Sequence, residues 1–166
     1  AELGLDEADR GRLLALLTRA AGGEGMVGGQ LLDLRAEGRD VTREELEEIH
    51  RGKTAALMAA AVRMGAVAGG AGPSLEERLE RFGRTLGLAF QAVDDILDVT
   101  GDADQLGKTG GRDRDLGKAT YPSVLGLEEA ERVSRELADR ALEELEGLDR
   151  TGLLADIVAY VIERRR

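Results

Sequence analysis

The amino-acid sequence predicts an all-α protein built as a helical bundle. Aromatic residues make up only 2% of its 166 residues, and β-branched residues form few runs, so a sandwich or barrel is disfavoured. Apolar residues recur instead at helical spacing, for example at Leu13, Leu14, Leu16 and Leu17. The length fits one domain of the usual ~100–200 residues.

Helical periodicity and end signals place each expected element. The expected helices are residues 5–20, 26–37, 42–68, 75–99, 123–148 and 152–166. Thr42 with Glu45, and Ser74 with Glu77, have the spacing of capping boxes. Residues 100–122 are rich in Gly, Asp, Lys and Arg and show no apolar periodicity. Loops of this length inside a compact domain are commonly functional or disordered.

Composition excludes several classes of protein. There is no cysteine and one histidine, so disulfide frameworks, zinc ribbons and histidine metal sites are excluded, and a bound metal must use oxygen ligands. A net charge of -10 disfavours sequence-independent binding of nucleic acid. The longest apolar run, Ala55 to Val62, is far shorter than the ~20 residues of a membrane span. We therefore expect a soluble, cytoplasmic protein.

Four polar residues share one face of the helix expected at 75–99, opposite its apolar stripe. Their spacing is i, i+3, i+4, i+7, and they are Gln91, Asp94, Asp95 and Asp98. This spacing stacks three carboxylates about one side-chain length apart. Like charges repel there, aspartate is a poor interior helix former, and the last turn of a helix is already negative.

Two interpretations of this stripe remain open, a solvated acidic face and a cation site. The three penalties favour an outside cation. Oxygen ligands with room for water suit Mg²⁺ better than a transition metal, and Mg²⁺ commonly joins a few carboxylates to substrate phosphates. The residues therefore predict Mg²⁺ as cofactor, bound by Asp94, Asp95 and Asp98.

Lys53 lies in the middle of the apolar stripe of the helix expected at 42–68. Its side chain either snorkels to solvent or points into a cavity that holds an anion. Together with the carboxylate stripe and with Lys108 and Lys118 in the long loop, a diphosphate held between Mg²⁺ and lysines is the better account. His50 flanks the same edge and is expected to be structural. Asp33 shares a face with apolar residues of its own helix in the same anomalous way.

Several motifs stand in order along the chain, and together they carry a resemblance. They are Gly28–Leu34, His50–Leu57, Phe90–Asp98, Gly101–Asp102, Leu106–Lys108 and Leu116–Pro122. With these motifs the chain resembles the trans-isoprenyl diphosphate synthases, most closely those that make farnesyl diphosphate in bacteria. The resemblance covers essentially the whole chain.

The resemblance implies a fold and a set of roles. Residues 1–166 would be the C-terminal half of the isoprenoid synthase fold and carry its second aspartate-rich motif, in which Asp94 is the direct Mg²⁺ ligand. The resemblance also implies that an allylic diphosphate is held by Lys53, Lys108 and Lys118. Thr54 would assist the carbocation chemistry, and Gln91 would lie beside the allylic substrate. The basic tail 164–166 would help to bind isopentenyl diphosphate.

The implied reaction is a head-to-tail prenyl transfer giving a farnesyl- or geranylgeranyl-type product. The leaving diphosphate is stabilised by Mg²⁺ and lysines, an allylic cation forms, isopentenyl diphosphate attacks, and a proton is lost. The family carries two aspartate-rich motifs, and this chain has one. We therefore expect the missing half to come from the same longer chain or from a partner chain, the isolated chain to be inactive, and the complete enzyme to be a homodimer.

Two other classes of function stay open. One is a noncatalytic regulatory or binding subunit that partners a complete synthase, and the other is a generic acidic helical interaction module. A degenerate subunit would be expected to lose its aspartates. Because Asp94, Asp95 and Asp98 are present together with the lysines, the enzyme is favoured.

Overall fold

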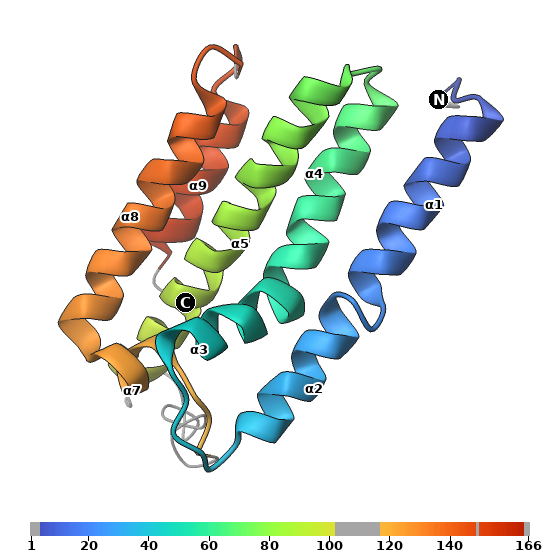
Figure 1. Ribbon diagram of the computed structural model, residues 1–166. Helices are drawn as coiled ribbons and strands as arrows, with labels where there is room; N and C mark the ends of the chain where they lie inside the picture. Colours follow the sequence, from blue (N-terminus) through green and yellow to red (C-terminus); the bar gives the residue numbers. More distant parts are fainter. Residues whose placement is uncertain (1–3, 102–116, 149, 165–166) are drawn as a thin grey trace.

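The computed structural model describes residues 4–101, 117–148 and 150–164, and these residues form helices joined by turns, with no strand among them (Figure 1). The elements are α1 (Glu7–Ala21), α2 (Met26–Ala36), α3 (Arg43–His50), the π-helical turn η1 (Arg51–Ala55), α4 (Ala56–Ala68), α5 (Pro73–Thr100), α7 (Tyr121–Leu125), α8 (Leu127–Leu145) and α9 (Leu153–Glu163). The predicted all-α class is confirmed.

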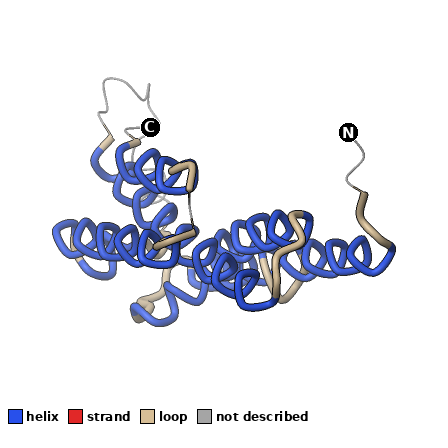
Figure 2. The backbone as a smooth tube through the Cα atoms, turned by 90° about the horizontal axis from the view of Figure 1, so that it is seen from above, coloured by secondary structure: helices blue, strands red, loops and turns tan. Residues whose placement is uncertain are grey.

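The helices form a row in which α5 is central. Figure 1 shows α1, α4, α5 and α8 side by side, with α9 behind α8 and with α2 and α3 below α1 and α4. Seen from above, the row is elongated, and α1 lies at one end (Figure 2). Because α5 packs against α4 on one side and α8 on the other, residues of α5 reach both halves of the bundle.

Two apolar clusters hold α5 in place. The first joins Phe82 and Leu86 of α5 to small and aliphatic residues of α8 and α9, including Ala141 and Val158. The second joins Ala92 of α5 to Leu46 of α3, Tyr121 of α7, and Ala130 and Val133 of α8. The second cluster lies at the end of α5 that carries the predicted carboxylate stripe, so that end has a rigid support.

One predicted capping box is confirmed and the other is wrong. At the start of α3 the hydroxyl of Thr42 accepts from the Glu45 N–H at 3.2 Å, and the Glu45 carboxylate accepts from the Thr42 N–H at 2.8 Å. At the start of α5 the capping position belongs to Gly72, with Pro73 as the first helical residue and no side-chain cap. Proline starts a helix well because its φ is preset and it lacks the N–H that would need a cap.

Two helices predicted as continuous are interrupted. The helix expected at 42–68 contains the π-helical turn η1, and the helix expected at 123–148 begins earlier, at Tyr121, and breaks at Gly126, where φ is +85°. A residue with this φ leaves the helical path, and glycine tolerates it without a Cβ clash. The N-terminus of α7 has an unpredicted box in which Thr120 and Ser123 cap each other.

The turn η1 is pressed against its neighbours at two glycines. A Cβ added at Gly29 of α2 would lie 2.0 Å from the Lys53 backbone nitrogen, and one added at Gly87 of α5 would lie 2.4 Å from the Ala55 Cα. Neither position has room for a side chain. Extra π turns within helices are frequent at functional sites, and here the close approach sets where Lys53 and Thr54 project.

The outer surface of α1 and α2 is unusually apolar. Leu14 is 63% exposed, Val27 55% and Leu34 54%. Apolar side chains gathered in this way mark surfaces that contact another polypeptide segment or a ligand. Within the described part of the chain, no helix has the length and apolar character to cross a membrane.

We predict that Gly87→Ala lowers the free energy of unfolding by about 1–3 kcal/mol, the range for overpacking a tight contact. Gly65→Ala in α4 is the matched control, because nothing lies within 4 Å of a Cβ there. That control should raise stability by about 0.5–1 kcal/mol, since alanine is the better helix former. Urea unfolding followed by circular dichroism measures both, and a stabilised Gly87→Ala protein would contradict the close-contact interpretation.

Candidate active site

The predicted site residues that the structure describes come from four segments, one of which is Arg164 at the end of α9. Lys53 and Thr54 lie in η1, the stripe lies at the end of α5, and Lys118 precedes α7. Lys108, Arg165 and Arg166 lie outside the described residues. In the sequence these segments are far apart, and the fold brings η1 against α5.

Lys53 is held by an ion pair that the sequence did not specify. Its Nζ lies 2.6 Å from Oδ2 of Asp33, which is 5% exposed on α2. The lysine side chain is 27% exposed, so it neither snorkels fully nor sits unpaired in a cavity. An ammonium has three donors, so Lys53 keeps donor capacity for an anion beside its contact with Asp33. In the sequence, the feature that marked Asp33 as unusual was its position on the apolar face of its helix.

A chain of hydrogen bonds runs from η1 into α5 and on to α7. The Thr54 hydroxyl donates to Oε1 of Gln91 at 2.8 Å, and Nε2 of Gln91 donates to Oδ1 of Asp95 at 2.9 Å. The other oxygen of Asp95 accepts from the Tyr121 backbone N–H at 2.9 Å. Two predicted site residues, Thr54 and Gln91, are therefore in direct contact.

The expectation that three carboxylates share one open face is wrong for Asp95. Asp95 is 3% exposed and points into the bundle, whereas the Asp94 side chain is 57% exposed. Neighbouring residues of a helix point about 100° apart, so an i, i+1 pair can divide between the interior and the surface. A buried carboxylate is tolerated where hydrogen bonds replace its water, and Gln91 and Tyr121 provide them.

Asp94 forms an ion pair with the first arginine of the basic C-terminal segment. Nη2 of Arg164 lies 3.0 Å from Oδ1 of Asp94 and donates also to the Phe90 carbonyl at 3.1 Å. The guanidinium stands 3.8 Å from the centre of the Phe90 ring, a cation–π contact. Asp94, the more exposed of the two neighbouring carboxylates, is thus paired with a counter-ion from the chain itself.

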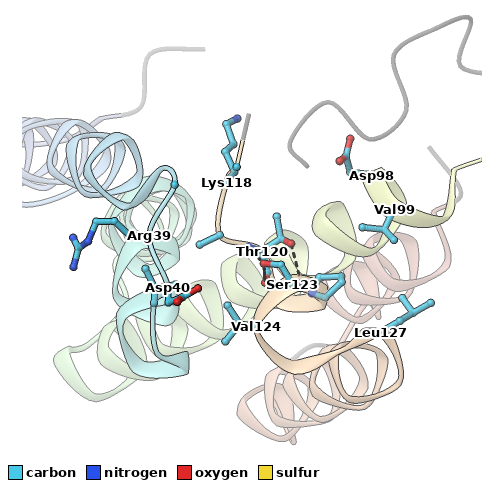
Figure 3. Close-up of a pocket in the computed structure, with 14 residues that line it drawn as sticks. Arg39, Asp40, Asp98, Val99, Lys118, Thr120, Ser123, Val124 and Leu127 are labelled. Carbon is cyan, nitrogen blue, oxygen red and sulfur yellow. Dashed lines mark hydrogen bonds between the residues drawn. The ribbon is translucent and has the colours of Figure 1, made fainter. Parts of the chain in front are cut away.

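Asp98 and Lys118 line the same cavity. Its volume is about 730 Å³, and it lies between the turn after α2, the end of α5 and the start of α7. Figure 3 shows Asp98 and Lys118 on different sides of this cavity, with Thr120 and Ser123 between them. Arg39 and Asp40 come from the turn after α2. A carboxylate and an ammonium at one cavity suit a ligand that carries both a metal and an anionic group.

Metal ligation by Asp94, Asp95 and Asp98 stays a prediction. Among the described residues, no three His, Cys, Asp or Glu side chains are grouped closely enough to hold a metal ion. Asp94 and Asp98 have oxygen atoms of the kind that Mg²⁺ prefers. A Mg²⁺ site built on them would need further ligands from water, substrate or other parts of the protein, which is the usual way in which Mg²⁺ is held.

His50 is buried beside this hydrogen-bonded chain. It is 3% exposed, its ring lies 5.2 Å from that of Tyr121, and its Nε2 lies 3.8 Å from Asp95. Burial, and then the nearby Lys53 ammonium, lower the pKa of His50 to about 3, against a small opposing effect of Asp33. The imidazole is therefore neutral near pH 7, so its contact with Asp95 is no ion pair and a structural role is supported.

We predict that the free energy of unfolding falls by about 2 kcal/mol between pH 7 and 5, because the unfolded histidine takes up a proton below pH 6.5 and the folded one does not. His50 is the sole histidine of the chain, so His50→Gln should remove most of this slope. Urea unfolding at several pH values measures it. A stability that is flat over this window would contradict the lowered pKa.

Comparison with known proteins agrees with this fold. The family model described as polyprenyl synthetase matches residues 4–159. Farnesyl diphosphate synthase of Escherichia coli (strain K12) is 46% identical over 98% of this chain and 56% of the relative, and a chloroplastic geranylgeranyl pyrophosphate synthase of Capsicum annuum is 47% identical over 89% of this chain and 42% of the relative.

Solved structures show the same arrangement of helices. The geranyltransferase of Helicobacter pylori, solved with magnesium and isoprenyl diphosphate, superposes with a TM-score of 0.79 at 33% identity, over 96% of this chain and 52% of the other. The geranylgeranyl pyrophosphate synthetase of Pyrococcus horikoshii, at 24% identity, shares the fold with a TM-score of 0.83, over 96% of this chain and 61% of the other.

The bundle is thus part of the helical isoprenoid synthase fold. The chain belongs to the polyprenyl synthetase family. It spans about half the length of the relatives that it matches.

Proposed function

We propose that the protein containing this chain is a prenyltransferase that condenses an allylic diphosphate with isopentenyl diphosphate, and that this chain is the C-terminal half of its catalytic domain. The observation that carries the proposal is the line of contacts from Asp33 through Lys53, Thr54 and Gln91 to Asp95, which gathers cationic, hydroxyl, amide and carboxylate groups between α2, η1 and α5. Membership of the polyprenyl synthetase family supports the reaction class.

Each group has a chemical task in this proposal. Lys53, Lys118 and Lys108 bind the allylic diphosphate, and Thr54 and Gln91 lie beside the allylic carbons. Asp94 and Asp98 hold Mg²⁺, which when bound neutralises charge on the leaving diphosphate. Cationic groups placed where negative charge develops are a large source of catalysis. For Asp95 the buried geometry supports a different role.

The proposal needs a second half of the protein. Each diphosphate substrate carries roughly -2 to -3, as phosphate ionisation indicates, and this chain carries -10 in addition. A few lysines and the cations at Asp94 and Asp98 do not balance that charge, so further cations are needed from outside the chain. The exposed apolar surface of α1 and α2, with Leu14, Val27 and Leu34, is where we place contacts with other polypeptide, including the partner of a homodimer.

A turnover assay tests the proposal. The native protein, given an allylic diphosphate and radiolabelled isopentenyl diphosphate, should form a prenyl product when Mg²⁺ is present and none when it is chelated. Lys53→Met should weaken diphosphate binding by roughly 1.5–3 kcal/mol, the range for a charge-assisted contact. Titration calorimetry measures that affinity, and a native protein without turnover would favour the regulatory subunit.

Lys53→Met needs a control, because it removes the ammonium that pairs with Asp33 and leaves the Asp33 carboxylate buried without that partner. Adding Asp33→Asn removes the unpaired charge, so the double variant should recover thermal stability, since an unpaired buried charge costs several kcal/mol, roughly 3–5. Diphosphate affinity should stay low in the double variant. An affinity that recovers with stability would show that Lys53 is structural.

Arg164 should compete with Mg²⁺ for Asp94. We expect Arg164→Gln to tighten Mg²⁺ binding by about two- to fivefold, since a partly exposed ion pair is worth about 0.5–1 kcal/mol. Arg135→Gln on α8 is the matched control, because its pair with Glu131 is exposed and neither residue lines the cavity that holds Asp98, and Mg²⁺ affinity should not change. Calorimetric Mg²⁺ titrations in the presence of an allylic diphosphate measure both variants. Unchanged affinity in Arg164→Gln would argue against Asp94 as a ligand.

A further inference from the structure

We propose that Asp95 is a positioning residue that sets the direction of the hydrogen bonds at Gln91 and Thr54, and that it is not a metal ligand. The inference rests on the proposed function, because it assigns Thr54 a defined orientation within that site. It concerns the middle carboxylate of the stripe Asp94, Asp95 and Asp98, which the sequence pattern alone treats as equivalent to the other two.

Both oxygens of Asp95 are engaged inside the protein. Oδ1 accepts from Nε2 of Gln91 and Oδ2 accepts from the Tyr121 backbone N–H, each at 2.9 Å. The residue is 3% exposed. A hydrated cation would have to reach this buried carboxylate past the helices around it, and the loss of either donor in the process would leave a buried polar group unsatisfied, which costs roughly 1–3 kcal/mol.

The contact with Tyr121 is rigid. Tyr121 is the first residue of α7 and is completely buried, and Thr120 caps the helix immediately before it. A backbone N–H has no rotamer with which to turn away. Oδ2 of Asp95 is therefore anchored, and the same carboxylate presents Oδ1 to Gln91 in a set position.

The donor and acceptor character of each group then determines the direction of the remaining hydrogen bonds, those at Gln91 and Thr54. An ionised carboxylate only accepts hydrogen bonds, so Gln91 must turn its NH₂ group toward Asp95 and its carbonyl toward Thr54. That carbonyl only accepts hydrogen bonds, so the Thr54 hydroxyl, 2.8 Å away, must donate its proton to Gln91. Thr54 is left with lone pairs for any other partner.

The direction of these hydrogen bonds affects the reaction. A hydroxyl whose proton is committed cannot donate to a diphosphate oxygen, but its lone pairs stabilise positive charge. Thr54 is thereby suited to the allylic carbons as they become cationic, and Lys53 next to it is suited to the diphosphate. The buried Asp95 divides these tasks without touching the substrate.

A pair of substitutions reverses and restores the direction. In Asp95→Asn the single side-chain oxygen stays with the Tyr121 N–H, so the new NH₂ faces Gln91 and forces its amide to turn over. Gln91 then donates to Thr54, whose hydroxyl proton is released toward the substrate. Adding Gln91→Glu supplies a carboxylate that accepts both from Thr54 and from the amide introduced at position 95. The hydrogen bond between positions 91 and 95 then runs in the reverse sense, but Thr54 donates as in the wild type and the net charge is that of the wild type.

Steady-state kinetics of the native protein test this design. Asp95→Asn should lower kcat roughly tenfold or more, where tenfold corresponds to about 1.4 kcal/mol of barrier. The Mg²⁺ concentration at half-saturation should not change, and the double variant Asp95→Asn with Gln91→Glu should recover most of kcat. Asp139→Asn, at an exposed position of α8, is the matched control and should leave kcat unaltered.

Two kinetic results would overturn the proposal. A raised half-saturation for Mg²⁺ in Asp95→Asn without recovery in the double variant would make Asp95 a metal ligand. An unchanged kcat in Asp95→Asn would show that the direction of these hydrogen bonds is without effect.

Nuclear magnetic resonance gives a readout that needs neither turnover nor a folded variant. In the ¹⁵N-labelled native protein the side-chain NH₂ of Gln91 should exchange with solvent at least tenfold more slowly than that of a free glutamine, as expected for a hydrogen-bonded group. Exchange at the free rate would refute the orientation. A protected Gln91 in a protein without turnover would leave the orientation standing and reject the proposed function.

Discussion

The close approach of the η1 backbone to Gly29 and Gly87 is the constraint on which the site depends. A π-helical turn makes this fit, because it widens the helix locally and seats Gly52 and its neighbours against α2 while Ala55 rests on α5. Lys53 and Thr54 are consecutive in this turn, so one contact surface directs the lysine to Asp33 on α2 and the threonine to Gln91 on α5.

Charges near this contact surface are balanced in pairs within the chain itself. Lys53 is matched by Asp33 and Asp94 by Arg164, and Asp95 accepts hydrogen bonds from Gln91 and from the Tyr121 N–H. An anionic substrate and its cation would therefore exchange partners with these pairs, and would not meet bare charges. Because the charges are paired in the unliganded protein, their desolvation cost is small in that state. The affinity for the substrate then depends on the difference in free energy between the ion pairs that break and those that form.

The half-length span of the chain gives the exposed surfaces a physical meaning. α5 is covered by α4 and α8, whereas α1 and α2 expose leucine and valine side chains at one end of the row. Related synthases are about twice as long, so a comparable protein has further polypeptide with which to bury apolar surface. Where further polypeptide buries such surface, the burial contributes about 25 cal/mol per Å² to stability.

The sequence by itself determined the all-α class, most helix positions, the cap formed by Thr42 and Glu45, and the region of α5 in which the site lies. These features depend on local periodicity and on residues three or four positions apart. Only the tertiary structure decided that Asp95 points inward, that Lys53 pairs with Asp33, and that Thr54 meets Gln91. The partners in these contacts are 20 to 37 positions apart. A helical pattern defines which residues share a face, but the packing of neighbouring helices decides which part of that face is buried.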